Sequence, residues 1–233
     1  MTAKPDLSSL GFRIATKVPR ASREIVDAFL DCPTTDIADA VGKMYTMSAG
    51  IKPLYAPIRR AAGSAVTVRV PPGDNLMVHA VLSYIQSGDV VVVDARGDTE
   101  YCLGGALMCA IAKHLGCRGF ILDGAYRDSY ELRKIDFPVY GRGVQPRPPR
   151  KLGPGEINMT IGCGGVPVNP GDIVVADEEG VVVVPLAYAE VVLDKARQRG
   201  KVDSDRWSHP AKHEAEHRAL YDKVLADAKC RID

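Results

Sequence analysis

Two adjacent residues of opposite charge, Arg127 and Asp128, follow directly after an apolar run that ends in Asp-Gly-Ala-Tyr. The planar fork of an arginine side chain can hold a carboxylate or a developing enolate in a fixed geometry. An aspartate is a hard oxygen ligand that suits Mg²⁺ or Mn²⁺, and Mg²⁺ commonly takes one carboxylate together with substrate oxygens and waters. An isolated Arg-Asp pair is more often a surface ion pair of little energetic value. The surrounding sequence therefore decides between the two interpretations.

A glycine pair, Gly104-Gly105, precedes this stretch and predicts a tight turn into a helix that ends near Leu115. The first amides of a helix lack intrahelical acceptors, and the helix dipole adds partial positive charge there. We therefore expect the amides of Leu107 and Met108 to form a site for a carboxylate or a phosphate.

Strands and helices alternate through the middle of the chain, which predicts an α/β domain. The run Val90–Val93 and the run Gly119–Leu122 are apolar throughout, as in strands that are buried on both faces. Ligands of such sheets bind beyond the carboxyl ends of the strands, which is where Arg127 and Asp128 lie. The other elements expected here are helices at 22–30, 34–41, 74–84 and 129–135, and strands at 64–70 and 137–141, with Thr34-Thr35 capping the second helix.

The segment from Asn158 to Pro185 has a different pattern, in which short apolar runs are joined by Gly, Pro and Asp turns. It predicts a β-meander with strands at 159–161, 166–168, 173–176 and 181–184, stacked as a second sheet on the first. An amphipathic helix is expected at 186–200, followed by a charged helical tail that faces solvent or another subunit. We therefore divide the chain into a loose N-terminal arm (1–20), a main domain (21–200) and a charged helical tail (201–233).

The chain resembles the RraA-like family in two motifs, G-F-I-L-D-G-A-Y-R-D at 119–128 and F-P-V-Y-G-R-G-V at 137–144. This family includes the regulator of ribonuclease E activity A and the class II 4-hydroxy-4-methyl-2-oxoglutarate/4-carboxy-4-hydroxy-2-oxoadipate aldolases. The resemblance runs from about Thr35 to Pro185. It implies an α/β chain with a three-layer β/β/α swivelling-domain fold, flanking N- and C-terminal helices, and homotrimers or homohexamers with sites at subunit contacts.

The resemblance also implies roles for individual residues. The arginine matching Arg127 contacts the pyruvyl group of the substrate as the catalytic residue, and the aspartate matching Asp128 coordinates Mg²⁺ or Mn²⁺. Backbone amides matching Leu107 and Met108 hold the substrate carboxylate. The substrate site that we expect therefore comprises Gly105, Ala106, Leu107, Met108 and Arg127.

One position departs from the aldolases, which usually carry an acidic residue 21 positions before that arginine to support the water shell of the metal. This chain has Ala106 there, and Asp98 or Glu100 in the preceding loop is a candidate substitute. Glu131 matches an acidic position that is common in the family, and solvation of its helix is the alternative role.

These residues point to a divalent-metal-dependent lyase that cleaves a 4-hydroxy-2-oxo acid by a retro-aldol reaction and releases pyruvate. Oxaloacetate decarboxylation passes through the same enolate, so one site can serve both reactions. No lysine lies within 120–128, which argues against a Schiff base at this point of the chain. The alternative is a non-catalytic, protein-binding regulator of the ribonuclease E inhibitor type. Asp128 favours the enzyme, whereas Ala106 favours the regulator.

Composition excludes several other classes of protein. Thirty basic residues nearly balance 29 acidic ones, and aromatic residues make up 6% of the chain, which argues against a nucleic-acid partner or a membrane surface. The N-terminus lacks the apolar run of a signal peptide, so we expect a cytoplasmic protein. None of the six cysteines forms a C-x-x-C pair, so neither a zinc knuckle nor a redox motif is indicated.

Two further stretches match known functional motifs in part, but their sequence context argues against those functions. The tail contains His213-Glu-Ala-Glu-His217, which matches the H-E-x-x-H pattern of zinc proteases. It stands among charged residues near the end of the chain, and we interpret it as a chance match. The run Gly162-Cys-Gly-Gly165 is followed by Val-Pro-Val-Asn-Pro, which cannot open a helix, so a dinucleotide or methyl-donor loop is excluded.

Overall fold

Three parallel strands form the centre of the molecule. They are β3 (Ala61–Arg69), β4 (Asp89–Cys102) and β5 (Gly119–Tyr126), and Val91 in the middle strand lies opposite Val66 and Phe120. This computed structural model describes residues 10–231, and within it the apolar parts of these strands are almost completely buried. Burial on both faces explains why the runs are continuously apolar instead of alternating.

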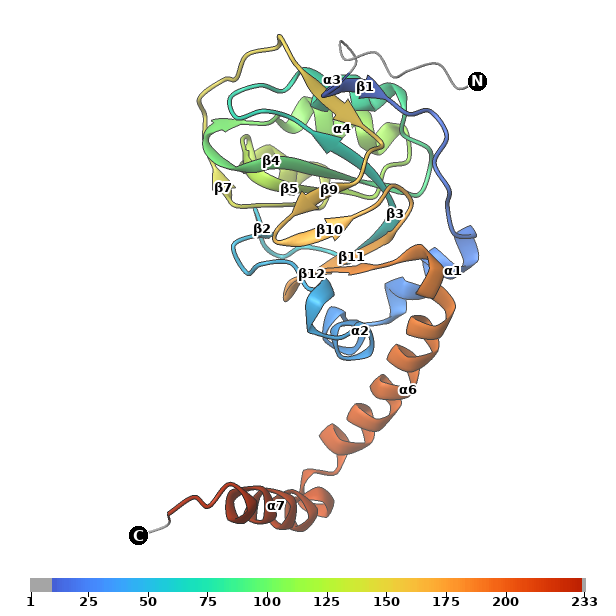
Figure 1. The fold of residues 1–233 in the computed structure, drawn as a ribbon, viewed down its shortest axis with the longest axis vertical. Helices are drawn as coiled ribbons and strands as arrows, with labels where there is room; N and C mark the ends of the chain where they lie inside the picture. Colours follow the sequence, from blue (N-terminus) through green and yellow to red (C-terminus); the bar gives the residue numbers. More distant parts are fainter. Residues whose placement is uncertain (1–9, 232–233) are drawn as a thin grey trace.

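The main sheet has ten strands, seven of them in the order β1-β8-β3-β4-β5-β6-β2 (Figure 1). A short β7 extends the pairing of β5, and the β11–β12 hairpin joins through β3. Two further strands, β9 and β10, form a separate antiparallel pair. The residue bounds of these strands are β1 (Phe12–Ile14), β2 (Lys52–Pro53), β6 (Val139–Gly141), β7 (Gly143–Val144), β8 (Gly155–Ile157), β9 (Ile161–Cys163), β10 (Val166–Val168), β11 (Ile173–Asp177) and β12 (Gly180–Val184).

Helices cover one face of the central strands, and strands cover the other, which gives the β/β/α layering. On the helical face α3 (Leu76–Ala80), α4 (Ala106–His114) and α5 (Ser129–Ile135) pack in one apolar core. On the opposite face, residues of β9–β12 pack against Ala65 and Ile121 in a second core. Successive strand residues point to opposite faces, so the same strands supply both cores.

A third group of helices covers the outer side of the β11–β12 hairpin. It consists of α1 (Arg23–Ala28), α2 (Thr34–Val41) and the first half of α6 (Ala189–Ser208), which share one apolar core. The second half of α6 leaves the body, and α7 (Pro210–Asp227) follows as a helix without a buried residue (Figure 1). Short 3₁₀ turns complete the chain at Phe29–Asp31, Lys43–Tyr45, Val81–Ser83 and Leu186–Tyr188.

Three expectations about these elements were wrong. The arm is not entirely loose, because β1 pairs with β8, although residues 1–9 lie outside the described part. The meander covers the central strands as expected, but it is not one separate sheet, since β11 forms hydrogen bonds with β3 and only β9 and β10 pair apart from the main sheet. The strand expected at 159–161 begins only at Ile161. The pairings of β1 with β8 and of β11 with β3 join segments far apart in the sequence, which local patterns do not encode.

The start of α2 also differs from the expectation that Thr34-Thr35 caps it. Pro33 is the capping residue, and Thr34 is already the first residue of the helix. The carboxylate of Asp177, from β11, accepts hydrogen bonds from the Thr34 backbone nitrogen at 2.9 Å and from its hydroxyl. A buried carboxylate 143 residues away therefore satisfies a helix start that is usually satisfied locally.

Candidate functional site

A cleft of about 240 Å³ opens where the end of β5 meets the start of α4. It is the location predicted from the sequence, beyond the carboxyl end of a parallel strand. The residues that line it come from α3, α4, the end of β4, the segment after β5 and the loop that follows β7. They are Asn75, His79, Leu82, Cys102, Gly104, Gly105, Leu107, Met108, Ile111, Arg127, Asp128, Pro148, Pro149 and Lys151.

Arg127 and Asp128 both line this cleft, and their side chains are 44% and 43% exposed. The Arg127 Nε lies 3.8 Å from Asp128 Oδ2, and the described residues 10–231 offer its guanidinium no other partner. Asp128 adopts a left-handed backbone conformation with φ of 63°, which is uncommon outside glycine. This conformation ends β5 abruptly and starts α5 at the next residue, so the pair sits at the rim of the sheet.

The carboxylate of Asp128 is fixed by a backbone amide. Its Oδ2 accepts a hydrogen bond of 3.0 Å from the nitrogen of Ala106, the first residue of α4. Within the described part of the chain, Oδ1 has no hydrogen-bond partner. A Cβ on Gly105 would collide with Asp128 Oδ2 and lie 3.2 Å from the Arg127 Nε. Glycine is therefore required at 105 because the ion pair passes directly over its backbone.

Two of the first three backbone amides of α4 already donate hydrogen bonds within the chain. Ala106 donates to Asp128, and Met108 donates to the Gly105 oxygen at 3.1 Å. The expectation that the Met108 amide is free was therefore wrong, because the first turn tightens into an i to i−3 bond. The Leu107 amide has no acceptor among residues 10–231, and the Leu107 side chain is 76% exposed. One amide of the expected pair thus remains for a ligand.

Three polar residues of the cleft were not singled out from the sequence: Asn75, His79 and Lys151. Asn75 is buried, and its amide nitrogen donates to the Leu103 oxygen at 2.9 Å, whereas its Oδ1 has no partner in the described chain. Partial burial of the His79 ring lowers its pKa by desolvation, and the nearby positive charge of Lys151 lowers it further. No local motif marks these residues, because the fold brings them together from a helix and a distant loop.

The cleft also contains a cysteine side chain, Cys102. Cys102 is buried, and burial raises the pKa of its thiol. A protonated thiol is a weak nucleophile and a poor metal ligand. The chemistry of the cleft therefore rests on the Arg127 guanidinium, the Asp128 carboxylate and the polar groups around them.

Within the described residues, the cleft offers a divalent cation a single carboxylate ligand, Asp128. Across residues 10–231 no cluster of three or more His, Cys, Asp or Glu side chains could hold a metal ion. Asp128 nevertheless presents one carboxylate oxygen without a partner, Oδ1, in an open cleft. One carboxylate with waters and substrate oxygens is a common arrangement for Mg²⁺, so Asp128 would be its single protein anchor.

Neither acidic candidate for the place of Ala106 reaches the cleft. The Asp98 carboxylate accepts hydrogen bonds from the backbone nitrogens of Gly73 and Glu100, both at 2.8 Å. Glu100 points to Arg147, with 3.4 Å between the charged atoms. Glu131 pairs with Lys134 on the exposed side of α5 at 3.1 Å, which agrees with a role in solvating the helix.

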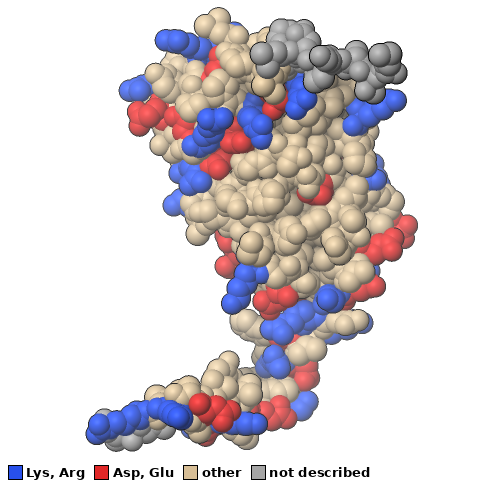
Figure 2. Space-filling view, in the orientation of Figure 1, with Lys and Arg blue, Asp and Glu red and all other residues tan. Residues whose placement is uncertain are grey.

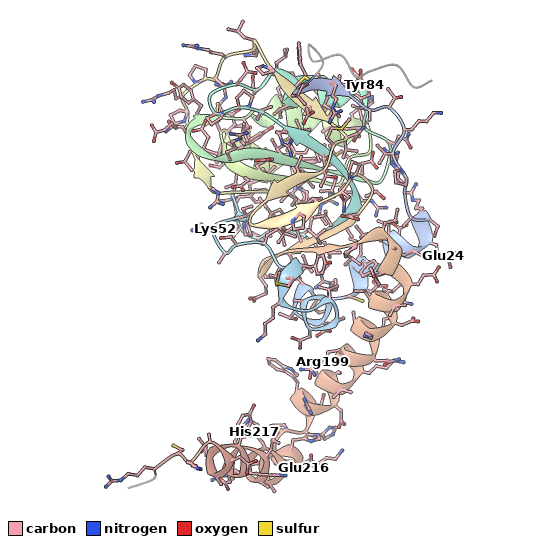
Figure 3. The ribbon with its side chains drawn as sticks, viewed as in Figure 1. Glu24, Lys52, Tyr84, Arg199, Glu216 and His217 are labelled. Atoms are coloured by element: carbon pink, nitrogen blue, oxygen red, sulfur yellow. The ribbon has the colours of Figure 1, made fainter. Side chains whose placement is uncertain are left out.

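His213 and His217 lie on α7, which extends away from the body of the molecule that holds the cleft (Figure 3). His213 already contacts Asp205 at 3.2 Å and Glu216 at 3.3 Å, and the ring of His217 packs on Tyr221. The structure places this motif on an exposed helix, consistent with a chance match. No helix of the described chain is long and apolar enough to cross a bilayer.

Comparisons with known proteins agree with the fold and with the motif. An RraA-like model, described as Aldolase/RraA, matches residues 34–183. A protein of Halalkalibacterium halodurans named "Putative 4-hydroxy-4-methyl-2-oxoglutarate aldolase" is 38% identical over 207 residues, which is 89% of this chain and 93% of the relative.

Two solved structures show the same arrangement of elements. An uncharacterized protein from Pseudomonas syringae pv. tomato superposes with a TM-score of 0.75 at 22% identity, over 87% of this chain and 99% of the other. Streptomyces coelicolor RraAS2, described as an unusual member of the RNase ES inhibitor RraA protein family, gives 0.71 at 25% identity, over 84% and 99%. The β/β/α fold expected from the motifs is thereby confirmed.

Proposed function

This chain belongs to the RraA-like family, and we propose that it is a divalent-metal-dependent lyase that splits 4-hydroxy-2-oxo acids into pyruvate and a second carbonyl compound. The observation that carries the proposal is the cleft at the end of β5, where Arg127, Asp128 and the Leu107 amide face one space. The Halalkalibacterium halodurans relative, named as an aldolase of this substrate class, supports the choice of reaction.

The residues of the cleft suit the charges of such a substrate. The unpartnered Leu107 amide at the start of α4 can receive the 2-oxo acid carboxylate, with the helix dipole behind it. The Arg127 guanidinium can bind the keto oxygen, where negative charge develops as the enolate forms.

Retro-aldol cleavage starts with loss of the 4-hydroxyl proton to a water molecule in the open cleft. The C–O electron pair then forms the new carbonyl, the C3–C4 bond breaks, and its electrons become the enolate of pyruvate. Arg127 stabilises this enolate by a charge-assisted hydrogen bond. The water that took the 4-hydroxyl proton then returns a proton to C3 of the enolate, and pyruvate is released with no net change in protons or electron pairs.

Asp128 would hold the divalent cation through Oδ1, since Oδ2 is engaged by the Ala106 amide. When bound, such a cation supplies Lewis-acid stabilisation of the charge that builds up on the substrate oxygens. Oxaloacetate decarboxylation generates the same enolate, and we include it in the proposal. Ala106 and the positions of Asp98 and Glu100 leave the cleft with a single carboxylate.

The test is a screen of 4-hydroxy-2-oxo acids and oxaloacetate, with pyruvate release as the readout. We expect a chelator to abolish release, and Mg²⁺ or Mn²⁺ to restore it. Full turnover by metal-stripped protein would contradict the proposal. Because Lys151 lines the cleft, borohydride treatment with pyruvate is the matched control, and a trapped adduct would point to a Schiff base instead.

We also propose that the chain assembles as a homotrimer or homohexamer. The body presents a broad surface with few charged residues over β9 and β10, and the tail carries exposed apolar side chains (Figure 2). Trp207 is 85% exposed, and Leu220, Tyr221 and Val224 are also exposed on α7. Large exposed apolar side chains that cluster indicate association surfaces. Light scattering at micromolar concentration should give three or six chain masses, and a monomer would contradict this.

The second candidate function is a protein-binding regulator. The likeness to the RNase ES inhibitor family and the alanine at 106 favour it. A ribonuclease E or ES cleavage assay with added protein measures it directly. Inhibition together with the absence of pyruvate release from every 2-oxo acid tested would make the regulator the better reading.

A further inference from the structure

The hydroxyl of Tyr126 lies beneath the floor of the cleft. Tyr126 is the last residue of β5 and directly precedes Arg127, and its side chain is completely buried. Its Oη donates a hydrogen bond of 3.1 Å to the oxygen of Gly105 and lies 3.2 Å from the Cys109 Sγ. The ring packs directly under Gly104, where a Cβ would stand only 2.7 Å from Cε2 and Oη.

The Gly105 oxygen and the Ala106 nitrogen belong to the same peptide unit. In a trans peptide these two atoms point in opposite directions within one plane. On the oxygen side of this peptide, Tyr126 supplies the side-chain donor, beside the Met108 and Cys109 amides of the helix turn, and Asp128 Oδ2 holds the nitrogen side at 3.0 Å. Two residues that flank Arg127 in the sequence therefore clamp one peptide from opposite sides.

The clamp fixes the two groups that face the cleft. A hydrogen bond to the carbonyl polarises the peptide and makes its N–H a stronger donor to the aspartate. This donor holds the Asp128 carboxylate, leaving Oδ1 turned to the cleft. The next amide along the chain is that of Leu107, so its direction depends on the same peptide plane.

We propose that Tyr126 is a positioning residue, whose buried hydroxyl sets the plane of the Gly105–Ala106 peptide and thereby the orientation of both the Asp128 carboxylate and the Leu107 amide. It does not touch the substrate, because it lies beneath the Gly104-Gly105 turn. This inference rests on the proposed function for its kinetic consequences, but its structural content does not depend on the reaction.

Protonation of the hydroxyl agrees with this role. Burial raises the pKa of Tyr126 well above its usual range, so the hydroxyl remains a neutral donor at every working pH. Burial also keeps the neighbouring Cys109 thiol protonated by raising its pKa. Tyr126 therefore acts through the geometry of its hydrogen bond to the Gly105 oxygen.

Tyr126→Phe removes the hydroxyl and keeps the ring. The matched control is Tyr140→Phe on the neighbouring strand β6, because Tyr140 is also completely buried but its hydroxyl has no partner in the described chain. A second control is Cys109→Ala, which leaves the bond from Tyr126 to Gly105 in place. Hydrogen exchange of the backbone amides in peptides covering 104–110 is read by mass spectrometry, and steady-state pyruvate release is measured across substrate and Mn²⁺ titrations.

We expect Tyr126→Phe alone to speed exchange in this segment. It should raise KM and the half-saturating Mn²⁺ concentration about fivefold, the net worth of one typical hydrogen bond, with a smaller change in kcat. The proposal is overturned if Tyr126→Phe exchanges at the wild-type rate, or if Tyr140→Phe or Cys109→Ala shows the same changes. If the wild type releases no pyruvate, the proposed function fails, while the exchange comparison still decides the role of Tyr126.

Discussion

The end of β5 and the helix α7 both carry residue types that bind metals, but they differ in what holds those side chains. The tail offers His213, Glu214, Glu216 and His217 within one exposed helix, where they contact one another and their neighbours (Figure 3). The cleft offers one carboxylate, Asp128, whose position is fixed by a backbone amide of another element. The helix α7 therefore has more metal-binding residue types, but their side chains are held less firmly than Asp128.

This difference shows why placement outweighs composition in a binding site. An exposed side chain on a helix keeps most of its rotamers, and ordering it for a ligand costs conformational entropy. Asp128 has already lost that freedom, because its Oδ2 is bonded and its backbone is held in a left-handed conformation. The following predictions test whether function follows the placed carboxylate or the richer helix.

Arg127→Lys should have the largest effect. Lysine keeps the positive charge but loses the planar fork, so the charge that develops on the enolate is no longer matched. We expect kcat for pyruvate release to fall by on the order of 10²–10³, the scale for losing one electrostatic donor. The matched control is Arg133→Lys, the same change on the exposed side of α5, which should leave the rate unchanged. A wild-type rate for Arg127→Lys would remove the guanidinium from the mechanism.

Gly105→Ala should lower the rate by about 10², although it changes no charged residue. The added Cβ would collide with Asp128 Oδ2 and crowd the Arg127 side chain, so both must move. A displacement of about 1 Å can cost a factor of this size. Gly143→Ala is the control, since a Cβ there meets no atom within 4 Å. Equal rates for wild type and Gly105→Ala would show that placement at this point does not matter.

Asp128→Ala should weaken metal activation more than it lowers the limiting rate. Among the described residues 10–231 it removes the only carboxylate that lines the cleft, so the half-saturating Mn²⁺ concentration should rise. Excess Mn²⁺ should then partly restore turnover, whereas it should not restore Arg127→Lys. Circular dichroism should match the wild type, because Asp128 is 43% exposed. A deficit that no Mn²⁺ concentration reduces would assign Asp128 a role other than metal binding.

The same contrast explains how much of the molecule the sequence predicts. Ser22 caps α1 by accepting a hydrogen bond from Ile25, and α5 spans Ser129–Ile135 as expected, because both depend on residues within one turn. The position of Arg127 and Asp128 at a strand end was also predictable, since apolar runs mark parallel strands. These features need only short-range patterns.

The features that sequence reasoning missed depend on contacts between distant segments. Asn75 and Lys151 meet in the cleft although 76 positions separate them (151 − 75), and no motif links the two. At the start of α2, the Thr34 amide donates to the carboxylate of Asp177. At the start of α4, the Met108 amide donates to the Gly105 oxygen. Composition and spacing indicate which residue types are present, but only packing decides which donors and acceptors remain free.

The smallest effect should come from the tail, where the double change His213→Ala and His217→Ala removes the histidines of the metal-like motif. Exposed ion pairs such as that of His213 with Asp205 contribute little to stability, and none of these residues lines the cleft of its own chain. We therefore expect the half-saturating Mn²⁺ concentration and kcat to stay within about twofold of the wild type, well below the losses from a single substitution beside β5. The measurement is pyruvate release across a Mn²⁺ titration, with light scattering to confirm that the assembly is unchanged.

The assembly matters, because in an oligomer α7 of one chain can approach the cleft of its neighbour. If the double variant keeps its mass but needs much more Mn²⁺, the tail supplies ligands to a neighbouring cleft. The contrast between the two regions would then disappear, because they would form one site shared between subunits.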